Sequence, residues 1–142
     1  MDNPDNYSHI YKQTIAWGDM DAFGHVNNVA YYRYIENARI SYLDRLGIFE
    51  YPIYIVVASS SCKYLSPVIY PDILDISVKI EEIRTSGFKM SYILWSQQQH
   101  KIIAQAETII VCINKDNGVK IPLPSHIKEK IIAMEINSNN DL

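Results

Sequence analysis

The segment from Trp17 to Asn28 gathers the side chains that could carry out a reaction. It places two carboxylates, Asp19 and Asp21, together with the imidazole of His25 and two carboxamides in a short stretch. A carboxylate can attack a carbonyl carbon, or it can activate a water molecule that does so. The same residue types also form ordinary turns, in which an Asx side chain bonds to its own backbone. Both interpretations are open at this point.

The place of this segment in the chain gives the chemical interpretation a physical basis. The segment ends where a helix is predicted to begin, and N–H groups at a helix N-terminus would stabilise an oxyanion. Gly24 allows the backbone to approach a ligand closely. Asp19, Asp21 and His25 could also ligate a metal, but their spacing fits no specific zinc or calcium pattern. We therefore expect no metal and no cofactor.

The helix that positions this loop is predicted from about Asn28 to Leu46. Asn27 or Asn28 can cap its start, and Gly47 follows its end, where a left-handed conformation is common. Five apolar residues recur at spacings of three or four and form one stripe: Tyr31, Ile35, Ala38, Tyr42 and Leu46. This stripe is expected to be buried against a sheet.

Alternating or continuous apolar runs, separated by short turn sequences, predict the strands. The predicted strands are Ser8 to Trp17, Tyr54 to Tyr64, Asp72 to Arg84, Phe88 to Gln97 and Lys101 to Asn114. A short helix is expected from Ser125 to Met134. One long helix and a twisted antiparallel sheet that wraps it make an α+β fold. The whole chain, 1–142, is expected to be a single domain, with residues 1–7 and 137–142 frayed.

Composition excludes several functional classes. A net charge of -3 argues against non-specific binding of nucleic acid, which needs a basic face. No apolar run approaches the length of a membrane span, and the polar N-terminus does not resemble a secretory signal. The two cysteines, Cys62 and Cys112, form no CxxC pair, so a disulfide scaffold and a cysteine zinc site are excluded. A cytoplasmic location is the expectation.

Two stretches resemble a known family. The string WGDMDAFGHVNNVAYYRYIENAR, and the later block from Cys62 to Leu74, are similar to motifs of the 4-hydroxybenzoyl-CoA thioesterase family of hotdog-fold acyl-CoA thioesterases. The likeness extends from about Tyr11 to Ile113. It implies a hotdog fold, with five to six antiparallel strands wrapped around one long central helix. It also implies hydrolysis of acyl-CoA to a carboxylic acid and free CoA, without a cofactor.

The resemblance assigns roles to residues of the first motif. Asp21 matches the catalytic carboxylate, which acts as a nucleophile or as a general base. Gly24, His25 and Val26 match the turn whose amides would polarise the thioester carbonyl. The assisting group is either His25, spaced from Asp21 as in the plant acyl-ACP thioesterases, or Asn28, where the Tol–Pal-associated branch has a histidine.

The resemblance also points to a substrate site shared between subunits. Tyr31 could line an acyl pocket, and Tyr54 and Ile55 fall roughly where the family supplies a backbone amide from a second subunit. A homodimer is implied, paired again into a tetramer. Three basic residues could meet the phosphates of CoA: Lys63, Arg84 and Lys89.

Two other functions are compatible with the same residues. One is a thioesterase that acts on acyl-carrier protein, although a pI near 5.7 gives little attraction for an acidic carrier. The other is a non-catalytic hotdog protein that only binds acyl-CoA, which would not need Asp21. The identity of the acyl group is open.

Overall fold

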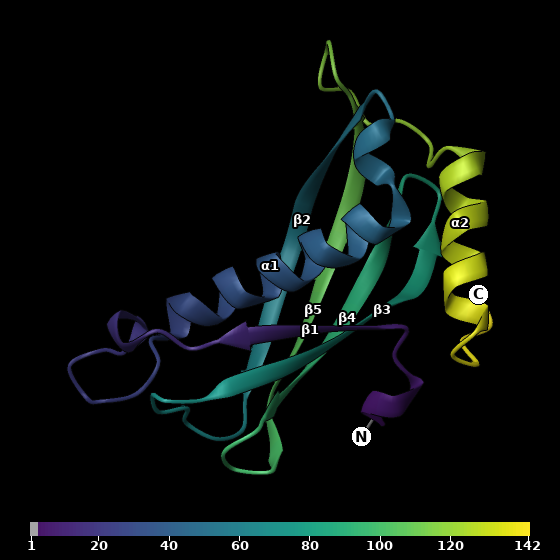
Figure 1. The fold of residues 1–142 in the computed structure, drawn as a ribbon. Coiled ribbons are helices and arrows are strands. Elements are labelled where there is room, and N and C mark those ends of the chain that lie inside the picture. The colour runs from purple at the N-terminus through teal and green to yellow at the C-terminus, as the bar shows by residue number, and fades with distance from the viewer. Residues whose placement is uncertain (1–2) are drawn as a thin grey trace.

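A five-stranded antiparallel sheet curves around one long helix, α1 (Asn28–Leu46) (Figure 1). The computed structural model describes residues 3–142. The strands are β1 (His9–Thr14), β2 (Ile53–Tyr64), β3 (Ile73–Arg84), β4 (Gly87–Ser96) and β5 (Lys101–Asn114), in the spatial order β1-β3-β4-β5-β2. The predicted α+β class, with a sheet wrapped around a central helix, is confirmed, and the sheet has five strands.

The ends of α1 lie where the capping residues predict them. The Asn27 side chain accepts a hydrogen bond from the Val29 N–H at 3.0 Å, which satisfies one of the free donors at the helix start. Gly47 has a φ of 78° and its N–H donates to the Asp44 carbonyl at 3.0 Å, which ends the helix. All five residues of the predicted apolar stripe are buried.

The sheet presents alternate residues to α1. Ile76, Val78 and Ile80 of β3 are buried on the helix side of the sheet. Gly87 begins β4 at a point of close approach, where an added Cβ would lie 1.8 Å from the carbonyl oxygen of Ile110. Only glycine fits there without moving β4 away from β5.

Two predicted elements differ in length from those observed by two residues or more. The first strand ends at Thr14, because residues Trp17–Asp19 form a 3-10 turn. The last helix, α2 (Ser125–Ile136), runs beyond the predicted Met134 because its next residue, Glu135, is buried and hydrogen-bonded. Neither α1 nor α2, the two α-helices within residues 3–142, is long and apolar enough to cross a membrane.

The two terminal segments that were expected to fray make contacts in this structure at two positions. Tyr7 is buried, and Asn140 donates from Nδ2 to the Ile80 carbonyl and to Glu135 Oε1, both at 2.7 Å. These contacts hold the two segments against the sheet. Met1 and Asp2 lie outside the described residues.

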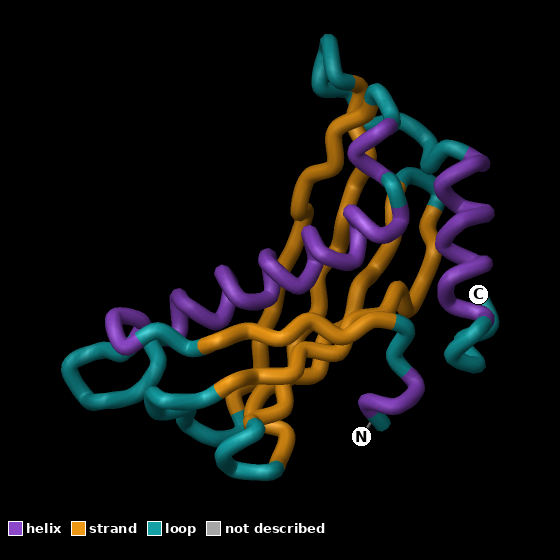
Figure 2. The backbone as a smooth tube through the Cα atoms, in the orientation of Figure 1, coloured by secondary structure: helices purple, strands orange, loops and turns teal. Residues whose placement is uncertain are grey.

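β2 forms an edge of the sheet. Among the described strands it pairs with β5 alone, so one side of a 12-residue strand has unpaired N–H and C=O groups. The loop before α1 and the turns before β3 and β5 gather at one end of the molecule, as Figure 2 shows. The candidate site lies at this end, beside the last residue of β2.

Candidate active site

The loop before α1 is a tight turn held by main-chain hydrogen bonds. The Asp21 N–H donates to the His25 carbonyl at 2.8 Å, and the Gly24 N–H donates to the Asp21 carbonyl at 3.1 Å. Gly24 has a φ of 80°, a conformation that favours glycine. The Val26 N–H donates to the Val68 carbonyl at 2.8 Å and fixes the loop to the segment before β3.

The two carboxylates of this loop have different surroundings. Asp19 Oδ2 accepts hydrogen bonds from the Tyr34 hydroxyl at 2.6 Å and from the Ala16 N–H at 3.1 Å. Burial, together with this bond to Asp19, raises the pKa of Tyr34. Asp21 is exposed, and its Oδ1 accepts from the Phe23 N–H at 2.9 Å, which is an Asx turn. Its Oδ2 has no hydrogen-bond partner within residues 3–142.

A cavity of about 430 Å³ opens at the exposed carboxylate. Its lining includes five residues that the motif predicts for the site: Asp21, His25, Val26, Asn28 and Tyr31. Gly24 shapes the turn but does not line the cavity. We call this space the Asp21 cavity. No group of three or more His, Cys, Asp or Glu side chains in the described chain could hold a metal ion.

The backbone amides of the turn are not equally available to a ligand. Those of Gly24 and Val26 donate to protein carbonyls, so in this structure they cannot polarise a substrate. The amides of His25 and Asn28 have no acceptor in the described part of the chain. The Asn28 amide stands at the first turn of α1, where the helix dipole favours negative charge. Of the three amides expected to polarise the carbonyl, that of His25 is open in this structure, and the Asn28 amide is open beside it.

Tyrosines form the wall of the cavity on the β2 side. The rings of Tyr31 and Tyr64 meet edge to face, with centroids 4.9 Å apart, and the Tyr64 hydroxyl donates to the Asn28 carbonyl at 3.4 Å. Burial raises the pKa of Tyr31 to about 12, with a smaller effect from Cys62 beside it. Burial also raises the pKa of the Cys62 thiol, which disfavours a thiolate nucleophile.

Sequence reasoning missed the residues that separate this cavity from its neighbour. A second cavity, of about 480 Å³, shares His25, Ser66 and Pro67 with the first. Gln99 holds that wall: its Nε2 donates to the Pro67 carbonyl at 2.7 Å and its Oε1 accepts from the Ser66 hydroxyl at 2.8 Å. Gln99 lies in the turn before β5, and nothing in the sequence links that turn to the Asp21 loop.

Two predicted substrate-binding residues lie far from Asp21 in the same chain. Tyr54 and Ile55 belong to the beginning of β2, whereas Tyr64 is its last residue. Nine residues of extended chain place Ile55 about 30 Å from Tyr64. A single chain does not bring Tyr54 or Ile55 to the Asp21 cavity.

The three basic residues predicted for CoA are not gathered in one place. Lys89 Nζ lies 3.3 Å from Glu81 and 3.4 Å from Glu107, so its charge is already balanced. Arg84 Nε lies 3.3 Å from a carboxylate of its own strand. Lys63 lines a different cavity from Arg84. This geometry gives no support to the prediction that these three residues meet the phosphates of CoA together.

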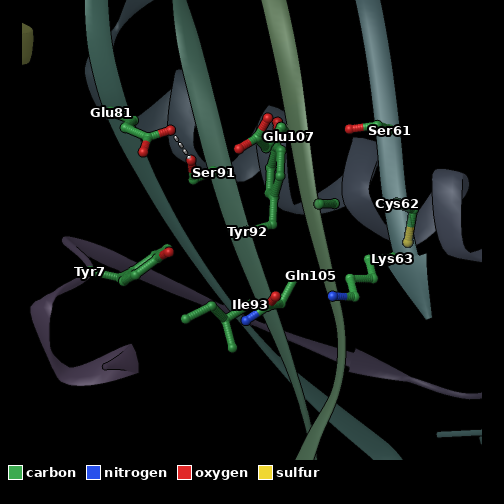
Figure 3. Close-up of a pocket in the computed structure, with 11 residues that line it drawn as sticks. Tyr7, Ser61, Cys62, Lys63, Glu81, Ser91, Tyr92, Ile93, Gln105 and Glu107 are labelled. Atoms are coloured by element: carbon green, nitrogen blue, oxygen red, sulfur yellow. Dashed lines mark hydrogen bonds between the residues drawn. The ribbon is translucent and has the colours of Figure 1, made fainter. Parts of the chain in front are cut away.

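The cavity that contains Lys63 lies over β2 to β5 and differs from the Asp21 cavity. It measures about 430 Å³, and Figure 3 shows its polar lining from several strands. Ser91 donates to Glu81 Oε2 at 2.7 Å, and this bond lowers the pKa of the Glu81 carboxyl. Glu81 is thus held as a hydrogen-bonded carboxylate on a strand, and no helix begins among the lining residues.

Comparison with known proteins places the chain in a family. The model of the thioesterase-like superfamily matches residues 15–131. A putative esterase of Aquifex aeolicus is 29% identical over 126 residues, covering 84% of this chain and 94% of the relative. The long-chain acyl-CoA thioesterase FadM of Escherichia coli is 24% identical over 119 residues, covering 81% and 90%.

Solved structures agree with this placement. A thioesterase from Thermus thermophilus, complexed with coenzyme A and Zn, superposes with a TM-score of 0.81 at 28% identity. The superposition covers 92% of this chain and 96% of that one. The predicted hotdog fold is confirmed, whereas the narrower 4-hydroxybenzoyl-CoA branch is not. The chain belongs to the thioesterase-like superfamily and is a thioester hydrolase with the hotdog fold.

Proposed function

We propose that this protein hydrolyses acyl-CoA thioesters to a carboxylic acid and free CoA, with Asp21 as the essential carboxylate. The observation that carries the proposal is the unpaired Oδ2 of Asp21 in a cavity at the start of α1. The names of the relatives support the substrate class, since one is an acyl-CoA thioesterase and another was solved with coenzyme A.

The geometry suits attack on an already activated carbonyl. Asp21 Oδ2 either attacks the thioester carbon to form an anhydride, which water then cleaves, or removes a proton from a water molecule that attacks it. In both routes the C–S bond breaks and CoA leaves as a thiolate. In the general-base route the thiolate takes the proton that Asp21 removed from water, and in the nucleophilic route it takes a proton from the solvent. Negative charge develops on the carbonyl oxygen, and in this proposal the amides of Asn28 and His25, which have no acceptor in the described part of the chain, stabilise it.

A second copy of the chain would complete the site. Asp21 is exposed, so water surrounds its carboxylate in the single chain. The unpaired edge of β2 ends beside the Asp21 cavity. Two copies that pair antiparallel along β2 bring the beginning of one strand to the end of the other. The partner's Tyr54 and Ile55 then approach the Asp21 cavity, which supports their proposed role in substrate binding and a homodimer.

Thiol release from a panel of acyl-CoAs tests the proposal. We expect the wild type to hydrolyse at least one chain length and Asp21→Asn to lose kcat with little change in KM. Asp19→Asn is the matched control: it removes a charge two residues away and should retain most of kcat. Equal activity in wild type and Asp21→Asn would refute the assigned carboxylate. No release by the wild type would refute the substrate class, and carrier-protein thioesters would be tested next.

The assisting residue can be identified by substitution. If His25 transfers the proton, His25→Ala loses kcat by about 10²-fold. If Asn28 assists instead, Asn28→Ala lowers kcat and His25→Ala keeps a kcat close to that of the wild type.

A further inference from the structure

A short segment, residues 66–68, separates the Asp21 cavity from the second cavity beside it, and we call it the dividing segment. Ser66 and Pro67 line both cavities. The carbonyl of Val68 accepts the hydrogen bond of the Val26 amide at 2.8 Å, which fixes the loop that carries Asp21. The dividing segment therefore sets both a wall of the Asp21 cavity and the position of that loop.

Main-chain hydrogen bonds alone hold the dividing segment weakly. Residues 65–72, which lie within the described part of the chain, join β2 to β3 without a helix or strand of their own. The N–H groups of Leu65 and Ser66 share one acceptor, the Ile103 carbonyl, at 2.9 and 3.2 Å. The Pro67 carbonyl has no main-chain donor within residues 3–142. A side chain or water has to supply its partner.

Gln99, in the turn before β5, supplies that partner. Its Nε2 donates to the Pro67 carbonyl at 2.7 Å, and its Oε1 accepts from the Ser66 hydroxyl at 2.8 Å. One carboxamide thus uses its donor and its acceptor on two successive residues, which holds both in a single orientation. No other side chain within residues 3–142 bonds to either of them.

The backbone that carries Gln99 is held by two buried residues, Asp72 and Ser96. The Ser96 hydroxyl donates to Asp72 Oδ2 at 2.5 Å and accepts the Gln99 N–H at 3.0 Å. Asp72 Oδ1 accepts the Gln98 N–H at 3.1 Å. The turn before β5 is therefore bonded to an acid that immediately precedes β3.

The same turn contains a residue in an uncommon conformation. His100, next to Gln99, has a φ of 53°, in the left-handed region that residues other than glycine rarely adopt. Such a conformation persists where the surrounding contacts fix it. The His100 N–H donates to the Ser96 carbonyl at 2.9 Å, which adds to the bonds from Asp72 and Ser96. Gln99 thus extends from a fixed support.

We propose that Gln99 is a positioning residue for the reaction of Asp21. Gln99 fixes the dividing segment, and the carbonyl of Val68 in that segment fixes the loop before α1. This inference rests on the proposed function, in which Asp21 is the essential carboxylate. Gln99 does not line the Asp21 cavity, so it acts without contact with the reacting carbon. A displacement of about 1 Å at a reacting group can lower a rate by about 10²-fold, so a remote bond is sufficient.

The first test measures the position of the loop without any substrate. Gln99→Met keeps the length of the side chain and removes both hydrogen bonds. We expect the Val26 amide to exchange with solvent about tenfold faster in this variant, because its acceptor is no longer fixed. Hydrogen exchange followed by NMR resolves this single amide, and urea unfolding verifies that the variant is folded.

Gln98→Met is the matched control. Gln98 lines the same second cavity as Gln99, but its side chain has no hydrogen-bond partner within residues 3–142. The variant makes the same chemical change in the neighbouring residue of the turn. It should keep the wild-type exchange rate of the Val26 amide, together with the wild-type kcat and KM.

The second test separates positioning from substrate binding. On the acyl-CoA that the wild type hydrolyses best, Gln99→Met should lower kcat by roughly tenfold or more and leave KM within about twofold of the wild type. In the Asp21→Asn background the same substitution should lower the residual kcat by about twofold or less, because the group that it positions is no longer a carboxylate.

Three outcomes would overturn the inference. The first is an unchanged exchange rate of the Val26 amide in Gln99→Met, and the second is an unchanged kcat in that variant. The third is a rise in KM that Gln98→Met shares, because both glutamines would then contact the substrate in the second cavity. Failure of the proposed function is distinct from these: it appears as no thiol release by the wild type, or as full activity in Asp21→Asn.

Discussion

Two carboxylates at opposite ends of the molecule have opposite surroundings. Glu135 of α2 is fully buried, and its Oε2 accepts hydrogen bonds from the hydroxyls of Ser8 and Tyr42, both at 2.5 Å. Its Oε1 accepts from Asn140. Asp21 is exposed, and one of its oxygens has no partner in the described chain.

The difference separates a structural carboxylate, Glu135, from the proposed catalytic one, Asp21. Hydrogen bonds to both oxygens compensate for the burial of Glu135 and leave it no capacity to act on a ligand. Asp21 is held by a single Asx turn and contributes little to folding, so an oxygen is free to react. A search by burial alone would therefore select Glu135 and pass over Asp21, the proposed catalytic acid.

The largest expected effect separates the two carboxylates by activity. Asp21→Asn should reduce kcat by about 10³-fold, because it removes the charged oxygen from the reacting carbon. Its urea midpoint should stay at the wild-type value. Steady-state thiol release and urea unfolding on the same preparations measure both quantities. A large loss of stability in Asp21→Asn would contradict the proposed difference between Asp21 and Glu135.

The next largest effect is expected at Glu135, where a substitution should lower stability and leave activity unchanged. Glu135→Ala should lower the free energy of unfolding by about 3 kcal/mol, because the hydroxyls of Ser8 and Tyr42 lose their acceptor inside the protein. At a temperature where the variant is folded, kcat should be close to that of the wild type. Urea unfolding followed by tryptophan fluorescence gives the first quantity. A kcat loss comparable to that of Asp21→Asn would contradict the structural role.

A smaller effect, on stability, is expected at Asp19, two residues before Asp21. Tyr34→Phe removes the hydroxyl that donates to Asp19 and should cost about 1 kcal/mol of stability. The double variant Asp19→Asn/Tyr34→Phe should lose less stability than the sum of the losses in the two single variants, because both substitutions remove the same hydrogen bond. Additive losses would show that Asp19 and Tyr34 act independently.

The smallest effect is a pH dependence near Glu135. His9 packs edge to face on Tyr42 at 5.8 Å, and burial, with a smaller contribution from Arg45, lowers the pKa of its imidazole below 6.5. The unfolded chain therefore binds a proton more readily than the folded one, so stability is full above pH 6.5 and falls as the pH drops below it. His9→Gln should reduce this fall in the free energy of unfolding, measured by urea titration between about pH 5 and 7.5. An unchanged pH dependence would exclude His9 as its source.

Local signals predicted the fold well, because they act within a few residues. The caps at Asn27 and Gly47 fixed both ends of α1, and alternation located the strands. The same reasoning could not distinguish Asp19 from Asp21, since the distinction depends on Tyr34, a residue of α1 that only folding brings to Asp19. Gln99 and Tyr64 are further cases, because only the folded chain brings them to the site.

The close contact at Gly87 has a consequence for a surface that Gly87 itself does not line. The carbonyl of Ile110 occupies the place of a missing methyl group, and the side chain of the same residue lines a cavity of about 250 Å³ between α1 and β2. A substitution at Gly87 that the chain survived would push β5 away and move a wall of this cavity. Inherited variation at Gly87 would thus reshape the cavity from the other side of the strand.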